Sequence, residues 1–179
     1  MDLKRFTMRI LGMRIFDVLS ISRTIKLYGY RKLLHLDNIV NIHSHVMIYP
    51  HHPQPKGFKK LNQTGVIIGK NCKIEDNVNI DSTGNVIIGD NVRFALEVLI
   101  FTHSHNYHSN PNLPPSDVTA TTLEINEGVV IGARAIILSS CHHIGKNARI
   151  GAGAVVTKDI PDNAIAVGTP AKVVKMLEL

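Results

Sequence analysis

The chain has few of the residues that mark several classes of protein. It contains no Trp, and aromatic residues make up only 5% of its 179 positions. Its two cysteines, Cys72 and Cys141, lie far apart, and neither belongs to a Cys-x-x-Cys pair. Together with the lack of a recognisable signal peptide, this predicts a protein of the reducing cytoplasm.

The sequence also lacks a run of basic residues interleaved with aromatics, which argues against nucleic acid as a partner. The net charge of +6 has two interpretations: a basic surface without a special partner, or attraction to a phosphorylated cofactor or acidic polymer. The longest apolar window near the N-terminus, 11–25, is interrupted by Arg14, Asp17 and Arg23, so a membrane-spanning helix is not expected there.

Large apolar residues, nearly all of them aliphatic, recur every six positions through much of the chain. The positions are Ile68, Ile74 and Ile80, then Ile88, Phe94 and Ile100, then Ile125, Ile131 and Ile137, then Ile144 and Ile150. A helix would repeat its apolar residues every three or four positions, and a half-buried strand every two. The six-residue step instead predicts a solenoid in which three short strands form one coil, with small residues in the bends. Such a narrow interior fits the low aromatic content.

These patterns divide the chain into parts. Residues 1–38 are predicted to be a helical segment whose basic and apolar residues interleave; we expect it to cap the solenoid or pack on a neighbouring subunit, with peripheral membrane contact as the alternative. Residues 39–64 form an irregular first coil and a Pro-rich loop, 65–166 the β-helix, and 167–179 a tail. The repeat fails at 106–122, which we interpret as a functional arm.

The repeat, the histidines before the arm and the ending Ile150-Gly-Ala-Gly-Ala-Val-Val-Thr-Lys-Asp, followed by Val167-Gly-Thr-Pro-Ala-Lys, resemble the hexapeptide-repeat acyltransferases. Over about residues 65–176 the chain is most similar to the sugar O-acetyltransferases, which include galactoside and maltose acetyltransferases and exopolysaccharide-modifying enzymes. The resemblance implies an all-β fold, a single-stranded left-handed parallel β-helix. It also implies a homotrimer, acetyl-CoA as co-substrate in the groove between subunits, and a histidine base.

The resemblance assigns the base to His105, because the run from Ile88 to that residue matches the family without a gap. A neutral histidine is suited to accept the proton of a sugar hydroxyl near pH 7, and backbone N–H groups would stabilise the oxyanion. No covalent enzyme intermediate is implied. His103 is the reserve candidate and, with His108, is otherwise interpreted as a solvated or substrate-side residue.

The remaining site residues also follow from the resemblance. Asn79 and Asp81 are matched to acceptor-binding positions, although the ungapped register puts Thr83 at the position of the family's Asp. The CoA site is assigned to residues beside the pantetheine arm and the nucleotide phosphates, where lysines would meet negative charge: Ala133, Ala152, Thr157, Lys158, Lys172 and Lys175.

The sequence therefore predicts transfer of an acetyl group from acetyl-CoA to a hydroxyl of a sugar or glycan precursor, without a resident metal. A serine or amine acetyltransferase of the same fold is an alternative. A γ-type carbonic anhydrase, with zinc held by histidines, is a second alternative; the candidates are His103, His105, His142 and His143. The third is a β-helix that serves as a scaffold and catalyses nothing.

Overall fold

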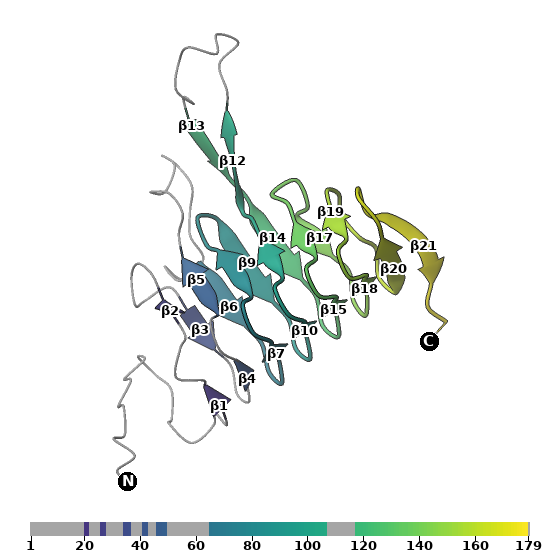
Figure 1. Ribbon diagram of the computed structural model, residues 1–179, viewed down its shortest axis with the longest axis horizontal. Coiled ribbons are helices and arrows are strands. Elements are labelled where there is room, and N and C mark those ends of the chain that lie inside the picture. The colour runs from purple at the N-terminus through teal and green to yellow at the C-terminus, as the bar shows by residue number, and fades with distance from the viewer. Residues whose placement is uncertain are drawn as a thin grey trace.

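The computed structural model describes residues 20–21, 26–27, 34–36, 41–42, 46–49, 65–106 and 117–178. Throughout these residues the regular structure is strand and turn, and the strands wind into a left-handed parallel β-helix (Figure 1). This confirms the predicted fold class. The coils follow one another from the N-terminal to the C-terminal end, and one two-stranded arm leaves the body (Figure 1).

Three sheets form the sides of the prism, and we call them faces A, B and C. In hydrogen-bonded order, face A contains β1 (Ser20–Ile21), β4 (Asn41–Ile42), β7 (Lys73–Ile74), β10 (Arg93–Phe94), β15 (Val130–Ile131), β18 (Arg149–Ile150), β20 (Ala164–Val167) and β21 (Lys172–Met176). Face B contains β2 (Lys26–Leu27), β5 (Met47–Tyr49), β8 (Asn79–Asp81), β11 (Leu99–Ile100), β16 (Ile136–Ile137) and β19 (Val155–Val156). Face C contains β3 (Leu34–Leu36), β6 (Val66–Ile68), β9 (Asn85–Ile88), β14 (Thr122–Ile125) and β17 (His143–Ile144).

The residues of the six-residue repeat point inward and stack in columns. On face B, Ile80 pairs with Ile100, and Ile100 pairs with Ile137. Face A has the matching column through Phe94 and Ile131, and all of these side chains are at most 1% exposed. Each rung lies about 4.8 Å from the next, the ordinary spacing of paired strands. One aliphatic per strand therefore fills the prism, as the repeat predicts.

Two of the three corners are built from residues with positive φ. At the corner between faces C and A, Asn71, Asn91, Asn147 and Asn163 have φ between 53° and 60°, and their side chains bond in pairs along the corner. Gly128 continues this column, where a Cβ would lie 2.5 Å from Asn147 Oδ1. Asn and Gly tolerate the left-handed conformation best, which is why the bends carry them. The corner between faces A and B uses Asn77, Glu97 and Arg134 in the same way.

The third corner, between faces B and C, carries the extra residues of the repeat. β5 ends and β6 begins at this corner, and residues 50–64 between them lie outside the described part. One coil later Ser82, Thr83 and Gly84 join β8 to β9, and in the next coil the arm joins β11 to β14. The arm begins with β12 (His103–Asn106) and returns with β13 (Asp117–Ala120), and these two strands pair antiparallel. Three successive coils therefore have insertions at one corner, which we call the B–C corner.

The prediction of a helical segment at 1–38 is wrong for the residues of that segment that the structure describes. They are strands β1, β2 and β3, and they pair in parallel with β4, β5 and β6 of the next coil. The local amphipathic pattern is overridden because an open coil edge offers a full row of hydrogen-bonding partners. The β-helix thus begins before residue 65. Among the described residues there is no helix with the length and hydrophobicity to cross a membrane.

The tail of the chain covers the opposite end of the solenoid. β21 pairs antiparallel with β20, the last parallel strand of face A. Between them, Gly168 accepts a hydrogen bond from the Val155 N–H at 3.0 Å, and the Ala171 N–H donates to Val155 O at 2.8 Å. The Val-Gly-Thr-Pro-Ala-Lys motif therefore runs beside face B before β21 begins.

Candidate active site

The B–C corner contains a buried carboxylate, Asp81, at the end of β8. The residue is 1% exposed. Its Oδ1 accepts hydrogen bonds from the Thr83 N–H at 2.9 Å and the Thr83 hydroxyl at 2.6 Å. Its Oδ2 accepts from the Thr102 N–H at 2.9 Å and lies 2.6 Å from His103 Nδ1. Burial by itself raises the pKa of Asp81, but the hydrogen bonds from Thr83, His103 and Thr102 outweigh it and hold the pKa below its usual value. The carboxyl group is therefore ionised at neutral pH.

Thr102 and Gly84 fix the backbone around this carboxylate. The Thr102 hydroxyl lies 2.9 Å from Asp81 O and accepts the Gly84 N–H at 2.8 Å. A Cβ on Gly84 would lie 1.9 Å from Thr121 O, so only glycine fits at that position. The Thr121 N–H donates to Thr102 O at 2.8 Å, which joins the two ends of the arm at its foot. The inserted segment from Ser82 to Gly84 thus contacts the foot of the arm and supports it.

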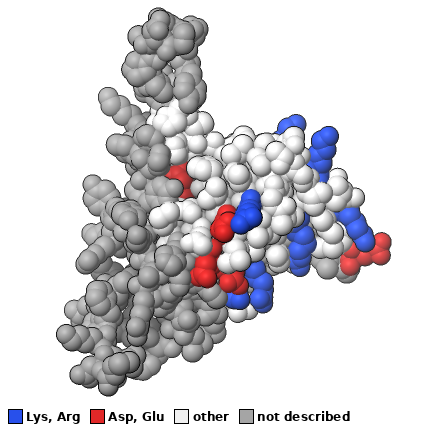
Figure 2. All heavy atoms as spheres, viewed as in Figure 1, with Lys and Arg blue, Asp and Glu red and all other residues white. Residues whose placement is uncertain are grey.

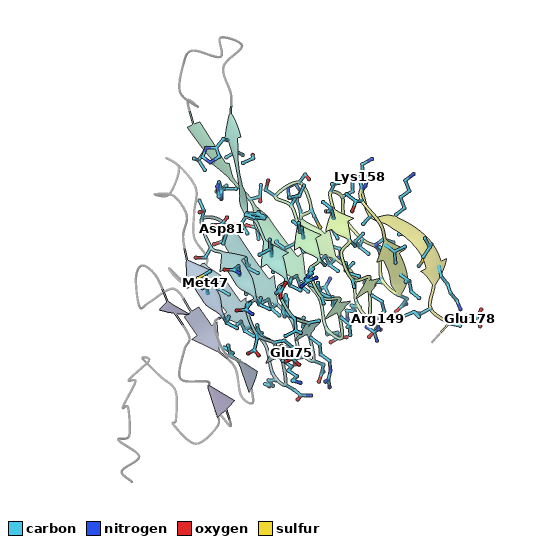
Figure 3. The ribbon with its side chains drawn as sticks, viewed as in Figure 1. Met47, Glu75, Asp81, Arg149, Lys158 and Glu178 are labelled. Atoms are coloured by element: carbon cyan, nitrogen blue, oxygen red, sulfur yellow. The ribbon has the colours of Figure 1, made fainter. Side chains whose placement is uncertain are left out.

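Two histidines, His103 and His105, follow Thr102 on β12, and Asp81 lies near the foot of the arm (Figure 3). The His103 side chain is 7% exposed, and His105 is half-buried. Their positions differ by two residues on one strand, so both side chains lie on the same side of it. The ring centroids are 5.2 Å apart and the ring planes meet at 82°.

The ionised Asp81 carboxylate determines which ring nitrogen of His103 carries the proton. An ionised Asp only accepts hydrogen bonds, so the contact at 2.6 Å requires His103 Nδ1 to donate. In the neutral ring, Nε2 then carries the lone pair. The structure therefore brings together Asp81 and both candidate histidines, and it is His103 that contacts Asp81. His108 lies outside the described residues.

Thr157 and Lys158 lie along the same corner. Because Ile80, Ile100, Ile137 and Val156 stack on face B, the residues that follow them form a column from Asp81 to Thr157. That column covers three strand spacings, or about 14 Å. Ser140 supports its far end by donating a hydrogen bond to Thr157 O at 2.9 Å, and Lys158 is exposed there (Figure 3). Only a long ligand can reach both ends of this column.

The other predicted site residues lie away from this corner. Ala133 and Ala152 are in turns between face A and face B strands. Lys172 and Lys175 belong to the exposed strand β21, and on the face shown in Figure 2 the Lys and Arg side chains project separately rather than in one patch. Within one chain, therefore, the predicted cofactor residues do not all lie near His103 and His105.

Asn79 lies on face B, at the start of β8, and lines a hollow of about 470 Å³. Its Oδ1 is buried and accepts no hydrogen bond from the described residues, while its Nδ2 donates to Asn77 O at 2.9 Å. The hollow is bordered by residues of three coils: Asn77, Glu97, Leu99, Arg134 and Ile136. Asn79 thus offers a polar atom to a ligand or to another chain on this face.

The structure adds residues to the site that sequence reasoning missed. No feature of the sequence indicated Thr102 or Thr121. The insertion after Asp81, in contrast, is visible in the sequence and lies at the site. The described His, Cys, Asp and Glu residues include no group of three that could hold a metal, so His142 and His143 do not join His103 and His105 in such a group. Both cysteines are buried.

The thiols of these cysteines are poor nucleophiles in this fold. Burial raises the pKa of the Cys72 thiol to about 11 and that of Cys141 to about 12. Reactivity of a cysteine requires the thiolate. The histidines and Asp81 are therefore better candidates than the cysteines for chemistry at the B–C corner.

Comparison with known proteins identifies the repeat. The family model described as the hexapeptide repeat of succinyl-transferase matches residues 63–82 and 123–158. Both matched segments belong to the six-residue repeat of this chain, which is therefore a hexapeptide repeat. It is 35% identical over 121 residues to a galactoside O-acetyltransferase of Lactococcus lactis, a match that covers 67% of this chain and 57% of the relative. The chain thus spans little more than half the length of that curated relative.

Solved structures agree with this hexapeptide-repeat fold. The crystal structure of a maltose O-acetyltransferase from Clostridium difficile is 29% identical, with a TM-score of 0.65, and covers 83% of this chain and 73% of that one. A hexapeptide-repeat acetyltransferase of Vibrio cholerae, solved with acetyl coenzyme A, is 22% identical with a TM-score of 0.68; the match covers 83% of this chain and 74% of that one. At 22% identity, the similarity to the Vibrio cholerae structure shows only that the two proteins share a fold. The predicted resemblance to hexapeptide-repeat sugar acetyltransferases is confirmed.

Proposed function

We propose that this hexapeptide-repeat protein transfers an acetyl group from acetyl-CoA to a hydroxyl group of a sugar or glycan precursor. The observation that carries the proposal is the group formed by Asp81, His103 and His105 at the B–C corner, at the foot of an arm that interrupts the repeat. The similarity to a galactoside and a maltose O-acetyltransferase supports a sugar acceptor.

In the proposed reaction, His105 is the general base. Its neutral ring nitrogen accepts the hydroxyl proton while the hydroxyl oxygen attacks the thioester carbonyl carbon of acetyl-CoA. Backbone N–H groups stabilise the resulting oxyanion. The carbon–sulfur bond then breaks, and the CoA thiolate takes up the proton from His105. The products are the acetyl ester and CoA, without a covalent enzyme intermediate.

Acetyl-CoA is proposed to lie along the B–C corner. Its length suits the separation of about 14 Å between Asp81 and Thr157. Lys158, Lys172 and Lys175 are candidates for the phosphates, because a lysine is a compact cationic partner for them. Asn79 and Asp81 remain the candidate residues on the acceptor side.

Ala133 and Ala152 lie at another corner, so this proposal assigns them to the cofactor groove through a neighbouring copy of the chain. A homotrimer would provide three such grooves, each made by two subunits. We propose the cytoplasm as the location because acetyl-CoA is available there.

The test is the variant His105→Ala. We expect its turnover to fall about 10²- to 10⁴-fold, the usual contribution of a general base, with acetyl-CoA affinity and oligomeric state unchanged. Turnover is measured as thiol release from acetyl-CoA with nucleotide sugars, lipid-linked sugars, free sugars and amino acids as acceptors. Lys146→Gln is the control, because Lys146 makes an exposed ion pair with Glu127 far from this corner.

Three results would contradict the proposal. Normal turnover by His105→Ala would exclude His105 as the general base. Transfer to amino acids alone would favour a serine or amine acetyltransferase. Lack of acetyl-CoA binding in a calorimeter would favour a β-helix that serves as a scaffold and catalyses nothing.

A further inference from the structure

We propose that His103 is a positioning residue that connects the buried Asp81 carboxylate to His105 and holds the His105 ring for catalysis. The inference deepens the proposed function and rests on it, since it assumes that His105 is the base. It gives separate roles to two histidines that lie on the same side of one strand.

The first argument is the rigidity of Asp81. Thr83 and Thr102 hold both carboxylate oxygens through backbone N–H groups at 2.9 Å. These donors belong to two different coils, so the carboxylate cannot rotate without breaking bonds to one of them. A ring that donates to this carboxylate at 2.6 Å is fixed in direction as well as in position.

The second argument is the place of His105 on the arm. A two-stranded hairpin by itself is only marginally stable in water, and β12 pairs only with β13 among the described strands. Close to the foot, the His103 side chain binds the arm to Asp81 in the body of the β-helix. The His105 ring then contacts the His103 ring edge to face at 5.2 Å. The His103 ring thus gives the His105 ring a contact that is fixed to the body of the β-helix.

The third argument is exposure. The His103 side chain is only 7% exposed, and its Nδ1 is occupied by Asp81. His105 is partly exposed and comes two residues later on β12, farther from the coil. From the interior outward the order is carboxylate, positioning ring, base.

Two substitutions of His103 separate positioning from base catalysis. In His103→Asn, the side-chain amide can still donate to Asp81 from about the position of Nδ1, but it has no basic nitrogen. In His103→Leu, no donor is left and the carboxylate loses a partner. If His103 positions, the Asn variant still binds the arm to Asp81 but lacks the ring beside His105, so its turnover falls about tenfold. The Leu variant also lacks the bond to Asp81 and loses about 100-fold, a cost that misplacing a catalytic group by about 1 Å can reach.

The measurements are kcat and KM with acetyl-CoA and the best acceptor of the panel described above. We expect the loss in His103→Leu to appear in kcat with KM for acetyl-CoA little changed. If His103→Asn is as inactive as His105→Ala while both bind acetyl-CoA, His103 is itself the base and the inference is wrong. If His103→Leu is fully active, His103 has no role in turnover and the inference is again wrong.

A second measurement needs no acceptor. Carbon–proton NMR spectra of the imidazole Cε1 groups, with His105 assigned from His105→Ala, report whether its ring has one environment. We expect a single narrow signal in the wild type and a broadened or doubled signal in His103→Leu. An unchanged His105 signal in the Leu variant would overturn the positioning role. If the wild type transfers acetyl to no acceptor, the proposed function fails, and the spectra still decide whether His103 orders His105.

Discussion

Replacement of Asp81 by Asn tests whether this carboxylate organises the B–C corner. The change preserves shape but converts one oxygen into an NH₂ group. If the amide replaces Oδ2, it faces the Thr102 N–H, which donates to Oδ2 at 2.9 Å. If it replaces Oδ1, it faces the Thr83 N–H instead. Either orientation leaves one backbone N–H without an acceptor, although His103 can adapt by changing its tautomer.

The expected loss follows from these bonds. A buried donor without a partner costs about 1–3 kcal/mol, and the bonds to an ionised carboxylate are about twice as strong as neutral ones. We therefore expect Asp81→Asn to lower the free energy of unfolding by about 2–4 kcal/mol at pH 7. That is a large part of the stability of an ordinary domain, which is about 5–15 kcal/mol.

The effect should also depend on pH in a defined direction. The pKa of Asp81 is lower in the folded chain than in the unfolded chain. Its stabilising contribution is therefore complete above the ordinary Asp pKa of about 4 and is lost as the pH falls through the depressed folded value. We expect wild type and Asp81→Asn to approach each other in stability over that acidic range.

Chemical denaturation at fixed protein concentration, repeated from pH 7 downward, measures both effects; the concentration is held constant because association would add to the apparent stability. Glu97→Gln is the matched control. The pKa of Glu97 is also lowered, by its bond to Arg134, but that ion pair is exposed and should contribute little. Equal stability of Asp81→Asn and wild type at pH 7, or a difference that stays constant in acid, would refute the reasoning.

Two further predictions concern the arm and the cofactor. Gly84→Ala should disrupt the foot of the arm, because its Cβ would lie 1.9 Å from Thr121 O; a lowered melting temperature and lost turnover check this, and a fully stable, active variant would contradict it. Lys158→Ala and Lys172→Ala should each weaken acetyl-CoA binding several-fold in calorimetry, with a smaller effect at high salt because ions screen exposed charges; unchanged affinity at low salt would remove that lysine from the proposed site.

The sequence predicts the body of the β-helix well because its rule is local and repeated. One large apolar residue every six positions determines which side chains point inward. The stacking of Ile80, Ile100 and Ile137 follows from that spacing once the insertions between them are recognised. The N-terminal strands could not be predicted in the same way. Their interleaved basic and apolar residues fit a helix locally, and only the open edges of β4, β5 and β6 make the strand pairings favourable.

The candidate site shows where such local reasoning ends. The register of face B puts Asp81 beside the residue that follows Ile100, so the sequence could bring Asp81 to the right coil. Which histidine it contacts depends on how the arm leaves that coil, and this is determined by Thr102, which bonds at once to Asp81, Gly84 and Thr121. No spacing rule describes a corner where the repeat is interrupted. Two corners consist of regular bends, and the insertions and the candidate catalytic groups both lie at the irregular third corner.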